Sequence, residues 1–269
     1  MARKLLSLGS VTSFEKFKEV YKQLSDLDLN FYKEAQMKRR IHSFMTNNGF
    51  GNDYTNFLGK LNTDDVMFDI FFKHLTINVT QFFRDAKYWD IFINTIVPDL
   101  MKTRNTLKLW SAGCSSGQEP YTLAMIFAEH FPGVSYTIMA SDIDVKVLEQ
   151  AKTGIYNARD FTTAPPKLVE KYLTRKSNDT FEVNNLLRKN ITFRSHNLLI
   201  DAFPAGMDFI ACRNVVIYFT EEAKTSLYQK FAQALSPEGV LFTGSTEHIF
   251  SAAEIGLKSK TPFFYYRAK

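Results

Sequence analysis

Two glycines, Gly113 and Gly117, bracket a loop of small residues that directly follows an apolar run ending at Trp110. Glycine lets a ligand lie close against backbone N–H groups, and the apolar residues beyond Pro120 predict a helix that begins there. Strand, glycine turn and helix form the first unit of a nucleotide-binding α/β sheet. Residues 107–125 therefore predict a nucleotide-type ligand, although a lone G-x-x-x-G also occurs as a structural turn.

The spacing of the loop favours one class of ligand. A dinucleotide fingerprint needs G-x-G-x-x-G, and a P-loop needs G-K-[ST] after its second glycine; this loop has neither. Glu119 stands at the mouth of the predicted helix, where its carboxylate would repel a pyrophosphate but would accept hydrogen bonds from an amino group or a ribose. S-adenosylmethionine, an adenosine with a cationic amino-acid tail, therefore fits best, with S-adenosylhomocysteine as its product.

A second carboxylate that could bind the same ligand is expected after the next predicted strand. Residues 134–140 read as a second strand, and Asp142 follows its end. The distance from Gly113 is about thirty residues, close to what a βαβ unit imposes. An acid at this position of such a unit binds ribose hydroxyls, so Asp142 is the predicted ribose ligand. Asp144 is predicted to cap the helix that follows.

A third candidate precedes the sheet. Thr80 can cap a helix that runs into Trp89, which would place Arg84 in or just after the first turn. A cation there opposes the helix dipole, so a ligand carboxylate is expected beside it. A partner in Asp85, or solvent, is the alternative.

A basic helix is predicted near the N-terminus over residues 31–45, with Asn30 as its N-cap. Basic residues occupy the side opposite its apolar residues and one flank: Lys38, Arg39, Arg40 and His42. Such a run is often only a solvated face.

The period of the apolar pattern changes near residue 100. Helices are expected before it, over residues 14–24, 31–45, 53–61 and 64–75. Further strands are expected after it, over residues 191–193, 207–212, 240–243 and 263–267, with a helix at 221–235 that Ser236–Gly239 separate from the strand at 240. We therefore expect a helical domain over residues 1–87 and a second domain over 88–269, which starts with a linking helix at 88–101 and contains a small β-subdomain at about 160–193.

The composition indicates a globular intracellular protein. The chain has 269 residues, of which 45% are hydrophobic, enough for one large or two modest domains. Its two cysteines, Cys114 and Cys212, argue for a reducing compartment and against a disulfide scaffold. Residues 1–11 mimic a signal peptide only faintly, and no stretch is long enough to span a membrane, so we expect a cytoplasmic protein. The net charge of +5 suits nucleic acid or an acidic protein.

Six ordered segments resemble the chemotaxis receptor methyltransferases, the CheR family, over nearly the whole chain: TINVTQFFRD, LWSAGCSSGQEPYTLAM, ASDID, HNLL, DFIACRNVVIYF and LSPEGVLFTGSTE. The resemblance implies an α/β fold, a Rossmann-like S-adenosylmethionine methyltransferase sheet with a helical N-terminal domain and a small β-subdomain insertion. It also implies an enzyme of chemotaxis adaptation. Such enzymes methylate glutamate side chains on cytoplasmic helices of chemoreceptors and form γ-glutamyl methyl esters.

The resemblance assigns site residues as well. The implied cofactor contacts, beside Gly113, are Asn78, Thr80, Arg84, Glu119, Asp142, Asn197, Leu198, Asn214 and Val215. Tyr218 matches a tyrosine near the transferred methyl group, and it would orient the acceptor carboxylate or the methyl donor together with Arg84. The basic helix would meet the acidic receptor helices. Some members grip a receptor's C-terminal peptide with a glycine-rich loop of the β-subdomain, but residues 176–185 contain no glycine, so tail binding is not expected here.

The implied chemistry needs neither a general base nor a metal, because a glutamate carboxylate with a pKa of about 4.3 is ionised at neutral pH. Removal of water and in-line alignment of the partners can supply most of the acceleration. Two alternatives remain. One is a methyltransferase acting on RNA or DNA, which the basic charge favours but the sequence after Cys212, without an N-P-P-Y type of motif, does not. The other is a non-catalytic S-adenosylmethionine-binding docking module.

Overall fold

The structure is a computed structural model that describes residues 6–268. Residues 1–5, part of the segment that faintly resembles a signal peptide, lie outside the described residues. The chain divides into two compact units. The helical unit holds residues up to Ile77 together with Tyr218–Lys224, and the sheet unit holds Asn78–Ile217 and the residues from Thr225 onward.

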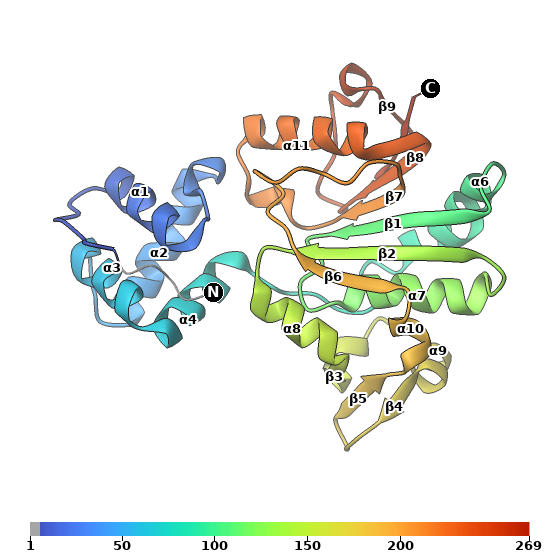
Figure 1. Ribbon diagram of the computed structural model, residues 1–269, viewed down its shortest axis with the longest axis horizontal. Coiled ribbons are helices and arrows are strands. Elements are labelled where there is room, and N and C mark those ends of the chain that lie inside the picture. The colour runs from blue at the N-terminus through green and yellow to red at the C-terminus, as the bar shows by residue number, and fades with distance from the viewer. Residues whose placement is uncertain (1–5, 269) are drawn as a thin grey trace. The chain divides into compact units, whose positions relative to one another are not determined.

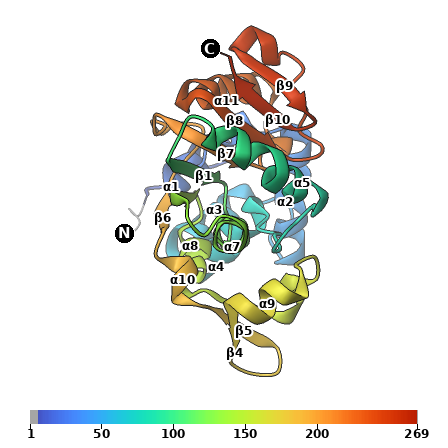
Figure 2. The same cartoon turned by 90° about the vertical axis from the view of Figure 1, so that its right-hand side faces the viewer.

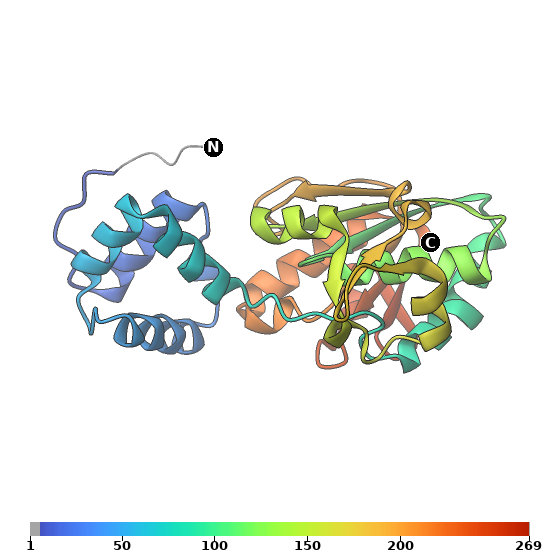
Figure 3. The same ribbon diagram turned by 90° about the horizontal axis from the view of Figure 1, so that it is seen from below.

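The helical unit is built from four helices, α1 (Phe14–Ser25), α2 (Glu34–Asn47), α3 (Tyr54–Thr63) and α4 (Asp65–Thr76), drawn in blue to cyan in Figures 1 and 3. Ser13, Asp53 and Asp64 cap α1, α3 and α4 through side-chain oxygens that accept backbone N–H groups, as these residue types favour. Stacked and tilted aromatic rings fill the space between the helices, and the fully buried ones are Phe17, Tyr21, Phe57 and Phe71.

Helix α2 begins later than the sequence predicts. Asn30 does not cap it, because Leu29–Phe31 form a separate 3-10 turn and Asp28 accepts the Asn30 N–H at 3.0 Å. The helix starts at Glu34, after an extended Tyr32 whose backbone pairs with Phe219.

The sheet unit contains a seven-stranded sheet in the order β6-β2-β1-β7-β8-β10-β9. Its strands are β1 (Thr106–Ala112), β2 (Ser135–Asp142), β6 (Ile191–Ser195), β7 (Met207–Cys212), β8 (Leu235–Thr243), β9 (Leu257–Thr261) and β10 (Phe264–Arg267). Strands β6, β2, β1, β7 and β8 run parallel, whereas β10 runs antiparallel to both of its neighbours (Figure 1).

Helices connect these strands. They are a continuous helical stretch of α5 (Lys87–Ile91), a π-helical turn (Phe92–Ile96) and α6 (Val97–Met101), followed by α7 (Gln118–His130), α8 (Val145–Thr153) and α11 (Glu221–Ala234). The predicted linking helix corresponds to the first stretch. Every residue of α7 from Pro120 to Phe127 is buried, because α7 lies between the main sheet and a second, smaller sheet (Figure 2).

The smaller sheet belongs to residues 155–188, which we call the insert. It has three antiparallel strands in the order β3-β5-β4, namely β3 (Ile155–Asn157), β4 (Leu173–Arg175) and β5 (Thr180–Val183). A 3-10 turn (Ala158–Phe161) and the helices α9 (Pro166–Tyr172) and α10 (Asn185–Arg188) complete it. The insert lies nearer the N-terminus than the expected 160–193, because Ile191–Ser195 pair with β2 in the main sheet.

Two further boundaries differ from expectation. The strand predicted to start at 240 starts earlier, because β8 already pairs with β7 at Leu235 and then shifts register. The domain boundary falls at residue 77 and not at 87, because the segment that follows is bonded within the sheet unit: Phe82 N–H donates to the Asp160 carbonyl at 2.9 Å and Phe83 N–H donates to Thr122 Oγ1 at 3.0 Å. The fold class is as predicted: a helical domain, a mixed, mostly parallel sheet covered by helices, and a small antiparallel sheet. No helix among residues 6–268 is both long and apolar enough to cross a membrane.

Candidate functional site

The sheet has a topological switch at β1, which lies between β2 and β7. The chain runs from β1 outward through β2 to β6, and later returns to the other side of β1 as β7 and β8. Ligands of open α/β sheets bind outside the carboxyl ends of the strands at such a point. The residues that directly follow the five parallel strands are therefore the candidates: Gly113, Ile143, His196, Arg213 and Gly244, with Asp142 as the last residue of β2.

The loop after β1 is held against β2 and β7. The N–H groups of Gly113 and Cys114 both donate to the carbonyl of Ser141, at 2.8 and 2.9 Å. Gly113 has φ +79°, and a Cβ there would lie only 2.5 Å from Val215 Cγ2 in the loop after β7. The structure thus brings the predicted residues Gly113 and Val215 into contact. Only glycine fits at position 113, because a side chain there would collide with Val215.

Asp142 closes this loop from the side of β2. Its Oδ2 accepts the Ser115 N–H at 2.8 Å and its Oδ1 accepts the Asp144 N–H at 3.0 Å. The residue is 7% exposed, and burial raises the pKa of Asp142 to about 6 although the amide hydrogen bonds act in the opposite direction. Each carboxylate oxygen keeps a further lone pair, which leaves room for hydroxyl donors.

Asp144 has the capping role predicted for it. Its Oδ1 accepts the Lys146 N–H at 2.9 Å at the start of α8. Its Oδ2 accepts a hydrogen bond from Asn78 Nδ2 at 2.9 Å, and the Asn78 carbonyl accepts one from Ser115 Oγ at 3.3 Å. These two bonds place Asn78, which precedes the sheet, beside the glycine loop.

The loop after β6 adjoins Asp142 as well. His196 N–H donates to the Asp142 carbonyl at 3.0 Å, which positions Asn197 and Leu198 directly beyond. Asn197 opens a turn, in which its Oδ1 accepts the Leu199 N–H at 3.0 Å, and Leu198 is buried. An amide and an apolar side chain at this place suit a planar base.

Glu119 is paired on both of its oxygens. Oε1 accepts from Ser111 Oγ at 2.7 Å, and Oε2 lies 3.4 Å from Nη1 of Arg213. Arg213 also binds Asp85 Oδ2 at 2.8 Å, and its guanidinium lies over the ring of Phe242 at 4.7 Å. Sequence reasoning did not single out Arg213. The available signal was a cation directly after a buried strand, where a charge needs partners.

The segment before α5 differs from its prediction. Thr80 caps no helix, because α5 begins only at Lys87 and residues 77–81 have no regular secondary structure. Arg84 lies in a turn between Phe83 and Asp85, which have φ of 53° and 58°, so the helix-dipole argument for a ligand carboxylate does not apply to it. Its Nη1 donates to the Val79 carbonyl at 3.0 Å. Asp85, the alternative partner, binds Arg213 instead.

Glu247 is a second residue that sequence reasoning missed. Its carboxylate accepts three backbone N–H groups, from Asn214 and Gly244 at 2.7 Å and from Val216 at 2.9 Å. It is 3% exposed, and burial raises its pKa. Glu247 thereby ties the loop after β7, which carries the predicted Asn214 and Val215, to the loop after β8. The sequence signal that could have identified Glu247 was its place as the acidic residue at the end of the segment LSPEGVLFTGSTE.

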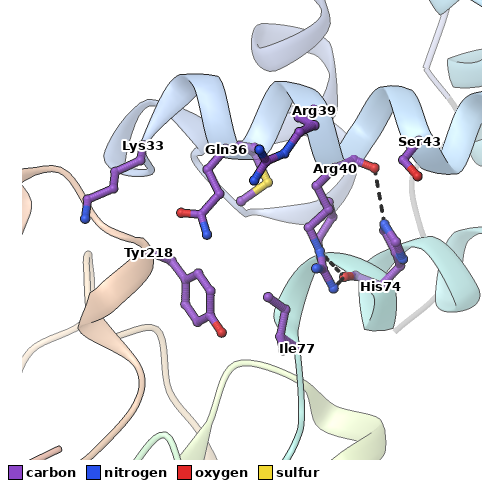
Figure 4. A pocket seen from close by; sticks show the side chains of 10 residues that line it. Lys33, Gln36, Arg39, Arg40, Ser43, His74, Ile77 and Tyr218 are labelled. Carbon is purple, nitrogen blue, oxygen red and sulfur yellow. Dashed lines mark hydrogen bonds between the residues drawn. The ribbon is translucent and has the colours of Figure 1, made fainter. Parts of the chain in front are cut away.

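The helical unit has a pocket of its own, a cavity of about 320 Å³ (Figure 4). Its lining residues are Lys33, Gln36, Met37, Arg39, Arg40, Ser43, His74, Leu75, Ile77 and Tyr218. Arg40 Nε donates to the His74 carbonyl at 2.6 Å, which fixes its guanidinium against α4, and burial lowers the pKa of Arg40. The Tyr218 side chain points toward this pocket from the short segment after β7.

The predicted basic face of α2 is divided between two flanks. Lys38 lies over the ring of Phe14 in α1, 5.4 Å from its centre, and His42 is hydrogen-bonded to the Tyr54 hydroxyl of α3. Neither residue lines the pocket, whereas Arg39 and Arg40 do. The four basic residues therefore do not form a single surface, because residues 38 and 42 contact the neighbouring helices.

The two cysteines are free and buried, and burial raises the pKa of both thiols well above the usual value. They remain neutral near pH 7 and so are poor nucleophiles. Within the described part of the chain, no group of three or more His, Cys, Asp or Glu side chains is arranged to hold a metal ion.

Comparisons with known proteins match both units. Residues 12–76 match the family described as CheR methyltransferase, all-alpha domain, and residues 78–263 match CheR methyltransferase, SAM binding domain. A chemotaxis protein methyltransferase of Listeria monocytogenes is 40% identical over 252 residues, which cover 93% of this chain and 95% of that protein. Proteins of the same description from Borreliella burgdorferi and Salmonella typhimurium are 35% and 32% identical, over 83% and 78% of this chain and 83% and 75% of their own lengths.

Proposed function

Because the chain belongs to the CheR family of chemotaxis methyltransferases, we propose that it methylates glutamate side chains on the cytoplasmic helices of chemoreceptors. It is an S-adenosylmethionine-dependent protein-glutamate O-methyltransferase, and S-adenosylhomocysteine is its second product. The proposed products are γ-glutamyl methyl esters, and the proposed place of action is the cytoplasm.

The main observation that supports the proposal is the loop after β1, which is hydrogen-bonded to the carboxylate of Asp142. A Cβ at Gly113 would meet Val215 and one at Gly117 would meet Ala151, so both glycines are needed for the loop to pack closely against its neighbours in this position. Around it lie acceptors, the carboxylates of Glu119 and Asp142, that suit an ammonium group and ribose hydroxyls.

The other residues are given roles by their positions. We propose that Asn78 and Thr80 border the cofactor, since Asn78 is bonded to both Asp144 and Ser115 and so lies beside the glycine loop. Asn197 and Leu198 would flank the adenine. Asn214 and Val215 would form the wall fixed by Glu247, whose carboxylate holds the Asn214 amide.

Bound S-adenosylmethionine supplies a methyl group on a positively charged sulfur. The acceptor carboxylate is already ionised, so the protein has to orient it and exclude water rather than remove a proton. We propose Arg84 and Tyr218 for this orientation. Arg84 is half-buried and only partly engaged by the Val79 carbonyl, which suits a group that guides a carboxylate without holding it tightly.

Arg39, Arg40 and Lys33 line a pocket without a carboxylate among its lining residues. A positive surface attracts an acidic helix, so we propose the pocket flank of α2 as the surface that meets the receptor. Lys38 and His42, on the other flank, were part of the same expected surface and are proposed only as its border.

Tethering to a receptor tail is not part of the proposal. Strand addition needs free backbone groups and close approach. The β4–β5 hairpin loop has no glycine, and Arg175 occupies its carbonyl groups: Nε binds that of Ser177 at 3.2 Å and Nη2 that of Asn178 at 2.7 Å. Calorimetry with a receptor's C-terminal peptide should show no binding; micromolar binding lost on mutation of Phe181 would contradict this.

The test of function is methyl transfer from labelled S-adenosylmethionine to purified cytoplasmic receptor fragments. Label should enter the receptor and leave as methanol in mild alkali, as carboxyl methyl esters do. Alkali-stable label, or label on RNA, would overturn the substrate class. Binding of the cofactor without any transfer would favour the docking module.

A further inference from the structure

We propose that the insert is part of the cofactor site, and that Tyr156 in its strand β3 is a positioning residue for the loop between Gly113 and Gly117. The inference rests on the cofactor site proposed above. It assigns to the small sheet a role in binding S-adenosylmethionine that is independent of any receptor peptide.

Tyr156 reaches the loop through its hydroxyl, which donates to the Ser116 carbonyl at 2.6 Å. The tyrosine is 1% exposed, and burial raises its pKa well above the usual value, so the hydroxyl stays protonated and donates. Gly117 makes room for it, since a Cβ at that position would lie 2.8 Å from the Tyr156 oxygen. The contact therefore depends on the residue types in both elements, the tyrosine in β3 and the glycine in the loop.

This hydrogen bond is the second of two that fix a strained turn in the loop. Ser115 N–H is fixed by Asp142 Oδ2, and one residue later the Ser116 carbonyl is fixed by Tyr156. Ser115 and Gly117 both have left-handed φ, of 48° and 93°. A turn of this kind is kept by its surroundings, so loss of either hold should let it relax.

A second contact of the insert reaches the segment before α5. The backbone of Phe82 is held on both sides: its N–H donates to the Asp160 carbonyl at 2.9 Å, and its carbonyl accepts from Thr163 Oγ1 at 2.5 Å. Its ring stacks on Phe161 with centroids 4.5 Å apart and meets Tyr156 edge-on at 4.9 Å. The insert thus fixes two of the chain segments that are proposed to border the cofactor, the loop after β1 and the segment before α5.

Tyr156→Phe is the direct test, because it keeps the ring and its packing and removes only the donor. We expect the Kd for S-adenosylhomocysteine, measured by calorimetry, to rise about tenfold, as expected for a buried carbonyl left without its partner. The KM for S-adenosylmethionine should rise similarly, while kcat at saturating cofactor stays within about twofold of the wild type, since no group near the acceptor changes.

Tyr121→Phe is the matched control. Tyr121 is equally buried, but its hydroxyl donates to the Ala151 carbonyl at 3.1 Å and not to the loop. Only its backbone N–H reaches the loop, at the Gly117 carbonyl at 3.2 Å, and the substitution leaves that bond in place. It should lose comparable stability in urea and bind S-adenosylhomocysteine as the wild type does. Thr163→Val tests the second contact and should also raise the KM for S-adenosylmethionine.

An unchanged Kd in Tyr156→Phe would overturn the inference. So would an equal loss of affinity in Tyr121→Phe, since the effect would then reflect lost stability alone. A wild-type protein that did not bind S-adenosylhomocysteine would instead refute the cofactor site itself, so the two failures are distinguishable.

Discussion

Arg213 donates a hydrogen bond from Nη2 to the backbone carbonyl of Arg84 at 2.9 Å, and so the end of β7 sets the position of the turn before α5. The same guanidinium bridges Asp85 and Glu119, and its side chain is only 2% exposed. One buried cation therefore connects two residues proposed for the site, Arg84 and Glu119.

Arg213→Lys should disrupt this connection while keeping the charge. A lysine has no planar fork and cannot bind the Arg84 carbonyl and two carboxylates at once. We expect the free energy of unfolding to fall by about 1–3 kcal/mol and kcat/KM to fall about tenfold or more. Urea unfolding and methyl-transfer assays would measure these effects, and wild-type values in both would remove Arg213 from this role.

Asp142→Ala should weaken the binding of S-adenosylmethionine by about 1.5–3 kcal/mol, because ribose hydroxyls lose a charged acceptor. Calorimetry with S-adenosylhomocysteine is the measurement. NAD serves as the control ligand, and it should bind neither protein. Equal affinity of wild type and variant would exclude Asp142 from the site.

Cofactor affinity should depend on pH through the same residue. Hydroxyl donors favour the ionised carboxylate, so binding lowers the pKa of Asp142 from about 6, and affinity should rise as pH increases through 6 and level off above it. Without ligand the sign is opposite: because the folded pKa lies above the ordinary 3.8, the group stabilises the fold at low pH and this contribution is lost as pH rises through about 6.

Titration calorimetry from about pH 5 to about pH 8, a range that spans the Asp142 pKa of about 6, would measure this dependence. Asp142→Asn, which cannot titrate, should flatten the profile. A wild-type affinity that is constant over this range would contradict the prediction.

Arg39→Glu should slow receptor methylation while leaving cofactor binding unchanged, because Arg39 lines the pocket of the helical unit and has no place in the sheet unit. Lys38→Glu is the matched control: the charge change is equal, but Lys38 lies on the other flank over Phe14. Wild-type rates should fall as salt rises. If the two variants slow methylation equally, long-range charge alone explains the effect.

Much of the architecture was predictable from the chain, because buried strands and amphipathic helices leave a local period. The apolar run into Trp110 and the run MDFIAC became β1 and β7, and Asp142 lies at the end of β2 as expected. Parallel strands have their carboxyl ends at the same edge of a sheet. The spacing of the predicted strands along the chain was therefore enough to predict that Gly113 and Asp142 lie close together.

What could not be predicted depends on contacts between distant residues. Thr80 has the chemistry of a helix cap, but no helix follows it directly, since the backbone N–H groups of Phe82 and Phe83 bond to Asp160 and Thr122 instead. Glu247 and Arg213 acquire their roles from partners that lie far away in the chain. No local pattern encodes such partners.

The membership of Tyr218–Lys224 in the helical unit makes that unit a discontinuous domain. During synthesis it lacks one of its pieces until residue 224 of 269 has been made, so its completion has to wait for most of the sheet unit. A gene fragment that stops at residue 77 would lack Phe219, the pairing partner of Tyr32, and the Tyr218 wall of the pocket. Exchange of this domain between relatives therefore requires that two separate segments of the chain are exchanged together.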